Sequence, residues 1–178
     1  MEKDIVPSEQ ECMAMLREYK VPENIIRHSI KVKELSLEIA RKLKEKGINV
    51  NEKLVVAAAL LHDLDKAITL NCEKGSHGKV AADALKKLGM HSVAEIVRKH
   101  LIESMLNGEL KTIEEKIIFY ADKRVLDDKV VSLEERFEYL KKRYGLKDKA
   151  LMGIINEGYK KVVELEKELM GWTEDKSS

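Results

Sequence analysis

The sequence has no long apolar stretch and no excess of charge of either sign. Its longest uninterrupted apolar run ends at Leu61 and falls far short of the ~20 residues that a membrane-spanning helix needs. The formal net charge is +1, so neither a basic surface for nucleic acid nor an acidic tail is indicated. We therefore expect no membrane partner and find no strong signal for nucleic-acid binding.

Cysteine is scarce as well. The chain carries two, Cys12 and Cys72, and their separation does not match the spacing of cysteine metal ligands. A disulfide framework is not indicated, and a reducing compartment suits both thiols. The N-terminus is charged and lacks the apolar segment of a signal peptide. A cytoplasmic location is the expectation.

Strand chemistry is missing too, because no segment sustains the alternation of apolar and polar residues that a half-buried strand shows. Helix start signals are frequent instead. Pro22 and Asn51 each stand where a helix would begin. Four further pairs fit the capping box of Ser or Thr followed by Glu, namely Ser8 with Glu11, Ser92 with Glu95, Thr112 with Glu115 and Ser132 with Glu135. Glycines that follow amphipathic runs predict helix ends at Gly47, Gly89, Gly145 and Gly171.

These signals predict an all-α protein. Apolar residues make up 44% and charged residues 37% of the 178 residues, which is the composition of a globular chain long enough for one domain with a core. Loops are expected at about 65–76 and 102–111. The predicted helices span residues 8–19, 22–46, 51–64, 77–88, 92–101, 112–127, 132–144 and 148–170.

His62 and Asp63 stand side by side at the end of the apolar run from Val55 to Leu61. That run predicts a buried helix, and burying a carboxylate is costly unless it is paired or bound to a metal. The candidate partners each lie on the apolar face of their own predicted helix: His28, His77, His100 and Asp122. A divalent-metal site inside a helical bundle would satisfy all of them.

Each of these residues also has a simpler interpretation. A lone histidine on an apolar face, such as His28, is more often a hydrogen-bonded core residue than a metal ligand. Asp122 could pair with Lys123 or Arg124, and His77 could begin a helix at a solvated end. Five helices would then each need a separate reason for a polar group, whereas one cation accounts for all of them. Imidazoles combined with carboxylates suit Mn, Fe, Co, Ni or Zn better than Mg or Ca.

The order His28, His62-Asp63, Asp122 resembles the H…HD…D signature of the HD-domain metal-dependent phosphohydrolases. The segment 57–66, with sequence AAALLHDLDK, is similar to that family's core helix and following turn. The layout resembles the stand-alone HDIG-type group. It is also similar to the HD hydrolases that split dinucleoside tetraphosphates, and more distantly to the HD-GYP phosphodiesterases. Asp65 stands where the HDIG motif has glycine, and the GYP signature is absent.

This resemblance implies a helical bundle of the HD-domain type over about residues 22–144. Helices 8–19 and 148–170 would pack on that core within a single domain, 1–178. The apolar face of helix 148–170 either caps the bundle or forms the seam of a homodimer.

The resemblance also implies one or two divalent transition-metal ions. One ion would be bound by His28, His62, Asp63 and Asp122. Asp63 would bridge to a second ion, and the remaining ligands of that ion would be His77 and His100. The implied reaction is hydrolysis of a phosphate ester or anhydride of a small, nucleotide-like substrate by metal-bound hydroxide.

Two residues are the candidates for catalysis, Asp63 as the bridging ligand and Lys66 as a cation near the phosphate. Lys66 lies three residues after Asp63, where the family frequently has a lysine. Candidates for contacts to substrate phosphate are Lys66, Lys123, Arg124 and Arg136. Solvated or ion-paired surface side chains would explain these cations nearly as well.

Three hypotheses follow. The first is a phosphohydrolase, acting either as a phosphomonoesterase or on phosphodiester or pyrophosphate bonds. The second is a non-catalytic sensor module that binds metal and nucleotide. The third is a structural helical protein in which the six polar residues coincide by chance. The complete set of six ligand candidates, together with Lys66, favours the enzyme.

Overall fold

The computed structural model describes residues 4–66 and 77–173. Within these residues the chain is almost entirely helical, so the predicted all-α class is confirmed. The elements are α1 (Glu9–Glu18), α2 (Glu23–Glu45), α3 (Glu52–Leu61), α5 (Lys79–Lys87), α6 (His91–Arg98), α7 (Ile102–Leu106), α8 (Ile113–Lys123), β1 (Val125–Leu126), β2 (Lys129–Val130), α9 (Leu133–Arg143), the 3-10 helix η1 (Gly145–Lys147) and α10 (Lys149–Thr173).

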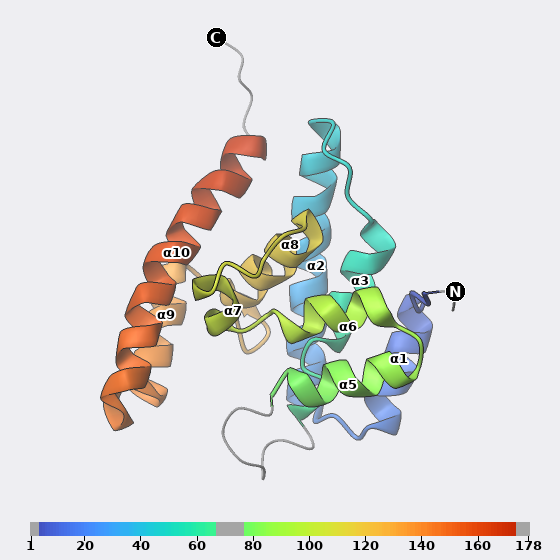
Figure 1. The fold of residues 1–178 in the computed structure, drawn as a ribbon, viewed down its shortest axis with the longest axis horizontal. Coiled ribbons are helices and arrows are strands. Elements are labelled where there is room, and N and C mark those ends of the chain that lie inside the picture. Colours follow the sequence, from blue (N-terminus) through green and yellow to red (C-terminus); the bar gives the residue numbers. More distant parts are fainter. Residues whose placement is uncertain (1–3, 67–76, 174–178) are drawn as a thin grey trace.

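Helix α2 is the long central element of the bundle and packs against α3 and α8 (Figure 1). Its buried apolar residues follow three-and-four spacing, as one face of a helix requires, and include Val32, Ile39 and Leu43. Helix α3 is buried almost all round, because its sequence is apolar from Leu54 to Leu61. These helices carry the predicted ligands His28 and His62, so the core itself positions the candidate site.

Two layers flank this centre. Helices α1, α5 and α6 lie on the side of α3, whereas α9 and α10 lie on the opposite side (Figure 1). Helix α10 packs on α7, α9 and η1 through buried residues that include Ile155, Val162 and Leu165. It thereby covers one side of the bundle. A homodimer seam on this helix stays a prediction.

Most helix starts follow the sequence signals. Ser8 and Thr112 form complete capping boxes with Glu11 and Glu115. The side chain of Ser132 accepts a hydrogen bond from the N–H of Glu135, and that of Asn51 accepts one from the N–H of Leu54. These caps agree with the prediction. Accepting groups at these positions satisfy N–H groups that the first helical turn leaves without partners.

The capping box predicted at Ser92 is wrong. Helix α6 begins one residue earlier, at His91, and the N-cap residue Met90 makes no side-chain cap. The N–H of Ser92 instead donates to the carboxylate of Asp4 at 3.2 Å. A residue 88 positions away in the sequence therefore supplies the acceptor for an N–H group in the first turn of α6.

Three of the four glycine signals predict helix ends correctly, at Gly47, Gly89 and Gly145. Gly47 and Gly89 have φ of +81° and +75° and directly follow α2 and α5. Gly145 follows α9 and begins η1. Gly171 does not end a helix, because α10 continues to Thr173. A glycine inside a helix costs about 1 kcal/mol relative to alanine but does not by itself stop the helix.

Two short elements differ from the prediction. The helix expected over 112–127 ends at Lys123, and a two-stranded antiparallel hairpin follows, with Val125 paired to Val130 and Leu126 to Lys129. Asp127 in its turn has φ of +54°, a conformation that a helix does not allow. The loop expected over 102–111 contains α7, which packs on α10.

Two predictions fall outside the described residues in whole or in part. They concern Cys72 and most of the loop at 65–76. Cys12, by contrast, is a buried free thiol in the core. Among the helices that the structure describes, none combines the length and the apolar character needed to cross a membrane.

Candidate metal centre

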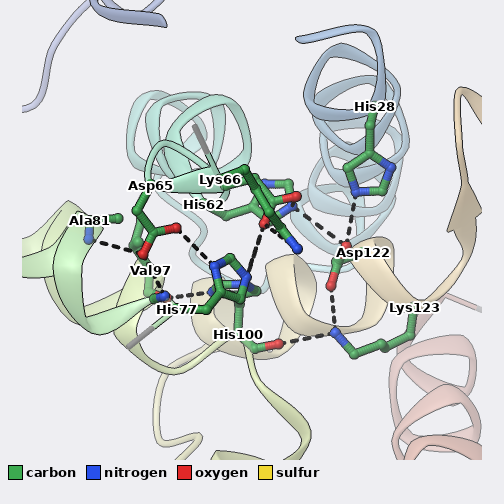
Figure 2. A network of polar contacts seen from close by, with 12 residues as sticks. His28, His62, Asp65, Lys66, His77, Ala81, Val97, His100, Asp122 and Lys123 are labelled. Carbon is green, nitrogen blue, oxygen red and sulfur yellow. Dashed lines mark hydrogen bonds and ion pairs between the residues drawn. The ribbon is translucent and has the colours of Figure 1, made fainter. Parts of the chain in front are cut away.

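The six predicted ligands converge at one place in the bundle; Figure 2 labels all of them except Asp63. His28 comes from α2, and Asp122 from the last turn of α8. His62 is the C-cap residue of α3, and Asp63 follows it. The last two histidines lie at the ends of short helices: His77 precedes α5 and His100 follows α6. All are buried except His77, which is partly exposed.

Three of the six residues form a first trio. Nε2 of His28 lies 3.0 Å from Oδ1 of Asp122, and Nε2 of His62 lies 3.5 Å from the same oxygen. The other three residues form a second trio around Asp63. Its Oδ1 lies 3.2 Å from Nε2 of His77 and 3.7 Å from Nε2 of His100.

Asp63 connects the two trios. While its Oδ1 faces His77 and His100, its Oδ2 lies 3.6 Å from Nε2 of His62 in the first trio. A carboxylate with one oxygen toward each trio has the geometry of a bridging ligand between two cations. This is the arrangement that the sequence resemblance implied for Asp63.

The four imidazoles all face the centre with the same nitrogen. Each Nδ1 contacts an acceptor outside the centre, and a backbone carbonyl can only accept, so Nδ1 donates. The acceptors are the carbonyl of Asp127 for His28 (2.8 Å), of Ala59 for His62 (2.7 Å) and of Val97 for His100 (2.5 Å), and Oδ1 of Asp65 for His77 (2.8 Å). Rings held in this way would turn the lone pairs of Nε2 toward a bound cation, which is how metal-binding histidines are usually oriented.

This set of atoms fits a cation. Ligand atoms about 2.1 Å from one metal ion lie about 3.0 Å apart at octahedral angles and about 3.4 Å apart at tetrahedral angles. The carboxylate–imidazole separations within the two trios run from 3.0 to 3.7 Å. Within the described part of the chain, Nε2 of His62 is buried and has no hydrogen-bond partner. A cation between these facing acceptors would satisfy them together.

Electrostatics keeps both carboxylates ionised. Burial favours the neutral form of Asp63, but the charge of His62 and the hydrogen bond from His77 outweigh burial and hold the pKa of Asp63 well below its usual range. Burial acts on Asp122 in the same way. The charge of Lys123 and the hydrogen bond from His28 hold the pKa of Asp122 well below its usual range.

Two of the histidines differ in protonation. Burial lowers the pKa of His77, but the hydrogen bonds to Asp63 and Asp65 outweigh it and raise the pKa to about 9. Burial, together with the charges of His62 and His77, lowers the pKa of His100 to about 3. At neutral pH His100 is therefore ready to bind a metal, whereas His77 carries a proton that a cation must displace.

Asp65 is a residue of this centre that the sequence did not reveal. In the sequence, Asp65 stands out only as a departure from the HDIG glycine. Its side chain is buried. The carboxylate accepts hydrogen bonds from Nδ1 of His77, from the N–H of Gly78 at 2.7 Å and from the N–H of Ala81 at 3.2 Å. Asp65 therefore orients His77 and satisfies N–H groups at the start of α5. A carboxylate twelve residues before a histidine was the only available signal.

The four predicted phosphate-binding cations occupy different surroundings. Lys66 and Arg136 line the hollow in front of the two trios. Lys123 also lines it, but its buried ammonium contacts Oδ2 of Asp122 and lies 3.1 Å from the carbonyl of His100. Lys123 thus neutralises a candidate ligand (Figure 2).

The side chain of Arg124 does not line this hollow. Its guanidinium donates to Oε1 of Glu166 at 2.9 Å, to the hydroxyl of Tyr120 and to the carbonyl of Val131. These contacts join α8 to α10 and to the hairpin. The structure thus gives Arg124 a packing role, because its side chain leaves α8 in a different direction from that of Asp122.

Two hollows open from the centre. The apolar hollow extends between α7 and α10 and is lined by Leu101, Ile102, Leu151 and Ile154. The arginine hollow extends along α9 and is lined by Arg136, Tyr139, Arg143 and Tyr144. Both hollows share the floor formed by His28, Asp63 and Lys66.

Comparison with known families agrees with this centre. The model of the HD domain matches residues 25–125, which is more than half of the chain and includes all six candidate ligands. The chain belongs to the HD-domain family. Metal-dependent hydrolases are members of this family, and the paired trios are groups that could hold their metal ions. The finer assignment to the HDIG-type group stays a prediction.

Two proteins are similar to this chain over most of its length. The chain is 33% identical to a tRNA (cytidine(56)-2'-O)-methyltransferase of Thermoplasma volcanium, over 82% of this chain and 44% of that protein. It is 30% identical to an uncharacterized protein of Methanocaldococcus jannaschii, over 75% of this chain and 85% of that protein. The chain thus spans less than half of the first relative and most of the second.

A solved structure has the same fold. A predicted HD superfamily hydrolase from an uncultured Thermotogales bacterium superposes with a TM-score of 0.51 over 91% of each chain, at 22% identity. At this identity the likeness concerns the fold alone. It supports the arrangement of helices that brings the six residues together.

Proposed function

We propose that this HD-domain protein is a phosphohydrolase that cleaves a phosphate ester or anhydride of a small, nucleotide-like substrate. The observation that carries the proposal is the pair of trios connected by the carboxylate of Asp63. Two neighbouring divalent cations supply a water molecule of lowered pKa as nucleophile and neutralise charge on phosphoryl oxygens. Imidazoles and carboxylates are the donors that Mn, Fe, Co, Ni and Zn prefer.

The protein's own residues would hold and orient these reactants. Asp63 would fix the separation of the two ions through its two oxygens. Nζ of Lys66 lies 3.9 Å from Oδ1 of Asp63, and 31% of its side chain is exposed. Lys66 can therefore contact a phosphoryl oxygen at the mouth of the centre and stabilise the negative charge that develops in the transition state.

A sensor is the second candidate. The observation that favours it is the match to proteins named as tRNA methyltransferases, in which the matched region covers 44% and 40% of each relative. The activity in those names is methyl transfer and not hydrolysis. A region with this fold can then serve as a module that binds metal and a phosphate without turnover.

The hydrolase and the sensor differ in one measurable property, which is whether the metal-loaded protein releases phosphate. The experiment loads purified protein with Mn²⁺, Co²⁺ or Ni²⁺ and screens nucleoside mono- and diphosphates, cyclic dinucleotides and dinucleoside polyphosphates. We expect release by the wild type and none by Asp63→Ala. The control Asp83→Ala changes an exposed carboxylate of α5 and should keep wild-type rates. If all substrates stay intact while calorimetry detects nucleotide binding, the sensor replaces the hydrolase.

A further inference from the structure

The arginine hollow is lined by the cationic side chains of Lys66, Arg136 and Arg143. Arg136, Tyr139 and Arg143 follow three-and-four spacing on α9, so their side chains lie on one face of the helix. The guanidinium of Arg136 lies 5.6 Å from the centroid of the Tyr139 ring, and that of Arg143 lies 5.7 Å from the same centroid. Arg143 also donates to the Tyr139 hydroxyl. The two arginines therefore flank one aromatic ring beside the metal centre.

These two guanidinium groups have no anionic partner among the described residues. The carboxylates in the hollow are Asp63 and Asp127, and neither forms an ion pair with Arg136 or Arg143. Nε of Arg136 is buried and makes no hydrogen bond within the described chain. Arg124, by comparison, contacts Glu166, Tyr120 and Val131.

A buried N–H group without an acceptor is unfavourable by about 1–3 kcal/mol, so such groups usually meet a ligand. Arginine binds phosphate with two parallel hydrogen bonds, and its planar group matches the spacing of phosphate oxygens. Arg136 lines both hollows, whereas Arg143 lines only the arginine hollow. Replacing Arg143 should therefore affect the binding of a second anionic group without affecting an anionic group at the metal centre.

We propose that the α9 face formed by Arg136, Tyr139 and Arg143 binds a second phosphate group of the substrate, adjoining the phosphoryl group at the metal centre. This inference rests on the proposed function. It selects a substrate with a P–O–P bridge over a phosphomonoester. Hydrolysis would form a bond from the oxygen of water to phosphorus and break the bridging P–O bond. The leaving phosphate would keep the bridging oxygen and its electron pair on the arginine face, and the proton of water would pass to solvent.

Binding of two non-hydrolysable probes tests the inference. Calorimetry compares methylphosphonate with methylenediphosphonate on metal-loaded protein at one fixed concentration of free metal, with the metal content measured after each titration. The wild type should bind methylenediphosphonate at least about tenfold more tightly, because one or more charge-assisted hydrogen bonds are added. Arg143→Gln should remove about tenfold of that affinity and change methylphosphonate binding less than about twofold.

Two further variants complete the test. Arg41→Gln changes an arginine on α2 whose side chain is 65% exposed, and it should leave both affinities unchanged. Arg136→Lys keeps the charge without the planar group and should lose part of the preference. Equal affinity of the wild type for the two probes, or an equal loss of both in Arg143→Gln, would overturn the inference.

The proposed function can fail separately. A wild type that prefers methylenediphosphonate but releases phosphate from no substrate keeps the arginine site and removes the hydrolase. A wild type that releases phosphate from monoesters and shows no preference for the second phosphate keeps the hydrolase and overturns the arginine site.

Discussion

Oδ1 of Asp65 lies 2.8 Å from Nδ1 of His77, and its second oxygen accepts the N–H of Gly78 at 2.7 Å. One buried carboxylate therefore joins a candidate metal ligand to the start of α5. The same carboxylate supports the pKa of His77 at about 9. The orientation of the second trio thus depends on a residue that contacts no proposed metal ion.

Replacing Asp65 should weaken the second metal site. In Asp65→Asn the amide can accept from His77, but its NH2 group would then face the N–H groups of Gly78 and Ala81. We expect the affinity for the second ion to fall about 10- to 100-fold, and the free energy of unfolding to fall by about 1–3 kcal/mol. Metal titration and urea denaturation measure the two effects. Asp83→Asn changes an exposed carboxylate of α5 and is the matched control; equal metal affinity in both variants would refute the positioning role.

Replacing Lys66 distinguishes an enzyme from a sensor. The Lys66→Ala variant should keep both metal ions and the wild-type melting temperature, because its ammonium contacts neither trio at hydrogen-bond distance; the 3.9 Å to Asp63 is an ion-pair separation only. It should lose turnover by about 100-fold or more, as removal of a group that stabilises transition-state charge does. Phosphate release measures the rate. The exposed lysine Lys79 provides the control variant Lys79→Ala. Unchanged turnover in Lys66→Ala would contradict a catalytic Lys66.

The stability of the metal-free protein should depend on pH through His77. Its pKa is about 9 in the folded chain against an ordinary value of 6.5. Because the folded value is the higher one, this stabilisation is complete below pH 6.5 and is lost as the pH rises to about 9. The difference corresponds to at most about 3 kcal/mol.

Urea denaturation of chelator-treated protein between pH 6 and pH 10 measures this contribution. The wild type should lose more stability over this range than His77→Gln, and the control His91→Gln should behave like the wild type. The same pH dependence in wild type and His77→Gln would show that His77 is not protonated in the folded chain. In the metal-loaded protein the sign is opposite, since the cation must displace this proton and binds more tightly as the pH rises.

The sequence predicted the fold and the convergence of six residues for one physical reason. A carboxylate at the end of an apolar helix, as at Asp63, needs partners, and the candidates recur on apolar faces at helical spacing. Helix caps at Ser8, Asn51 and Thr112 act within three residues, so local sequence contains the whole interaction.

The features that the sequence did not reveal depend on distant partners. Asp4 accepts from the N–H of Ser92 in the first turn of α6, and Asp65 accepts from Nδ1 of His77; no local pattern encodes either contact. Lys123 and Arg124 are neighbours of the same charge, yet successive residues on a helix point about 100° apart. One therefore contacts Asp122 while the other contacts α10. Two-residue strands such as β1 and β2 are too short to show a period.

The metal content of the protein is the decisive test of a two-metal centre. Protein loaded with Mn²⁺ or Co²⁺, dialysed and analysed by mass spectrometry of its metals, should hold about two ions per chain, because each trio supplies one set of donors. Asp63→Ala should hold none or retain only weak binding, and His77→Ala or His100→Ala should hold about one. A wild type that retains no metal after loading, or an Asp63→Ala variant with the full wild-type content, would show that these six residues do not form a two-metal centre.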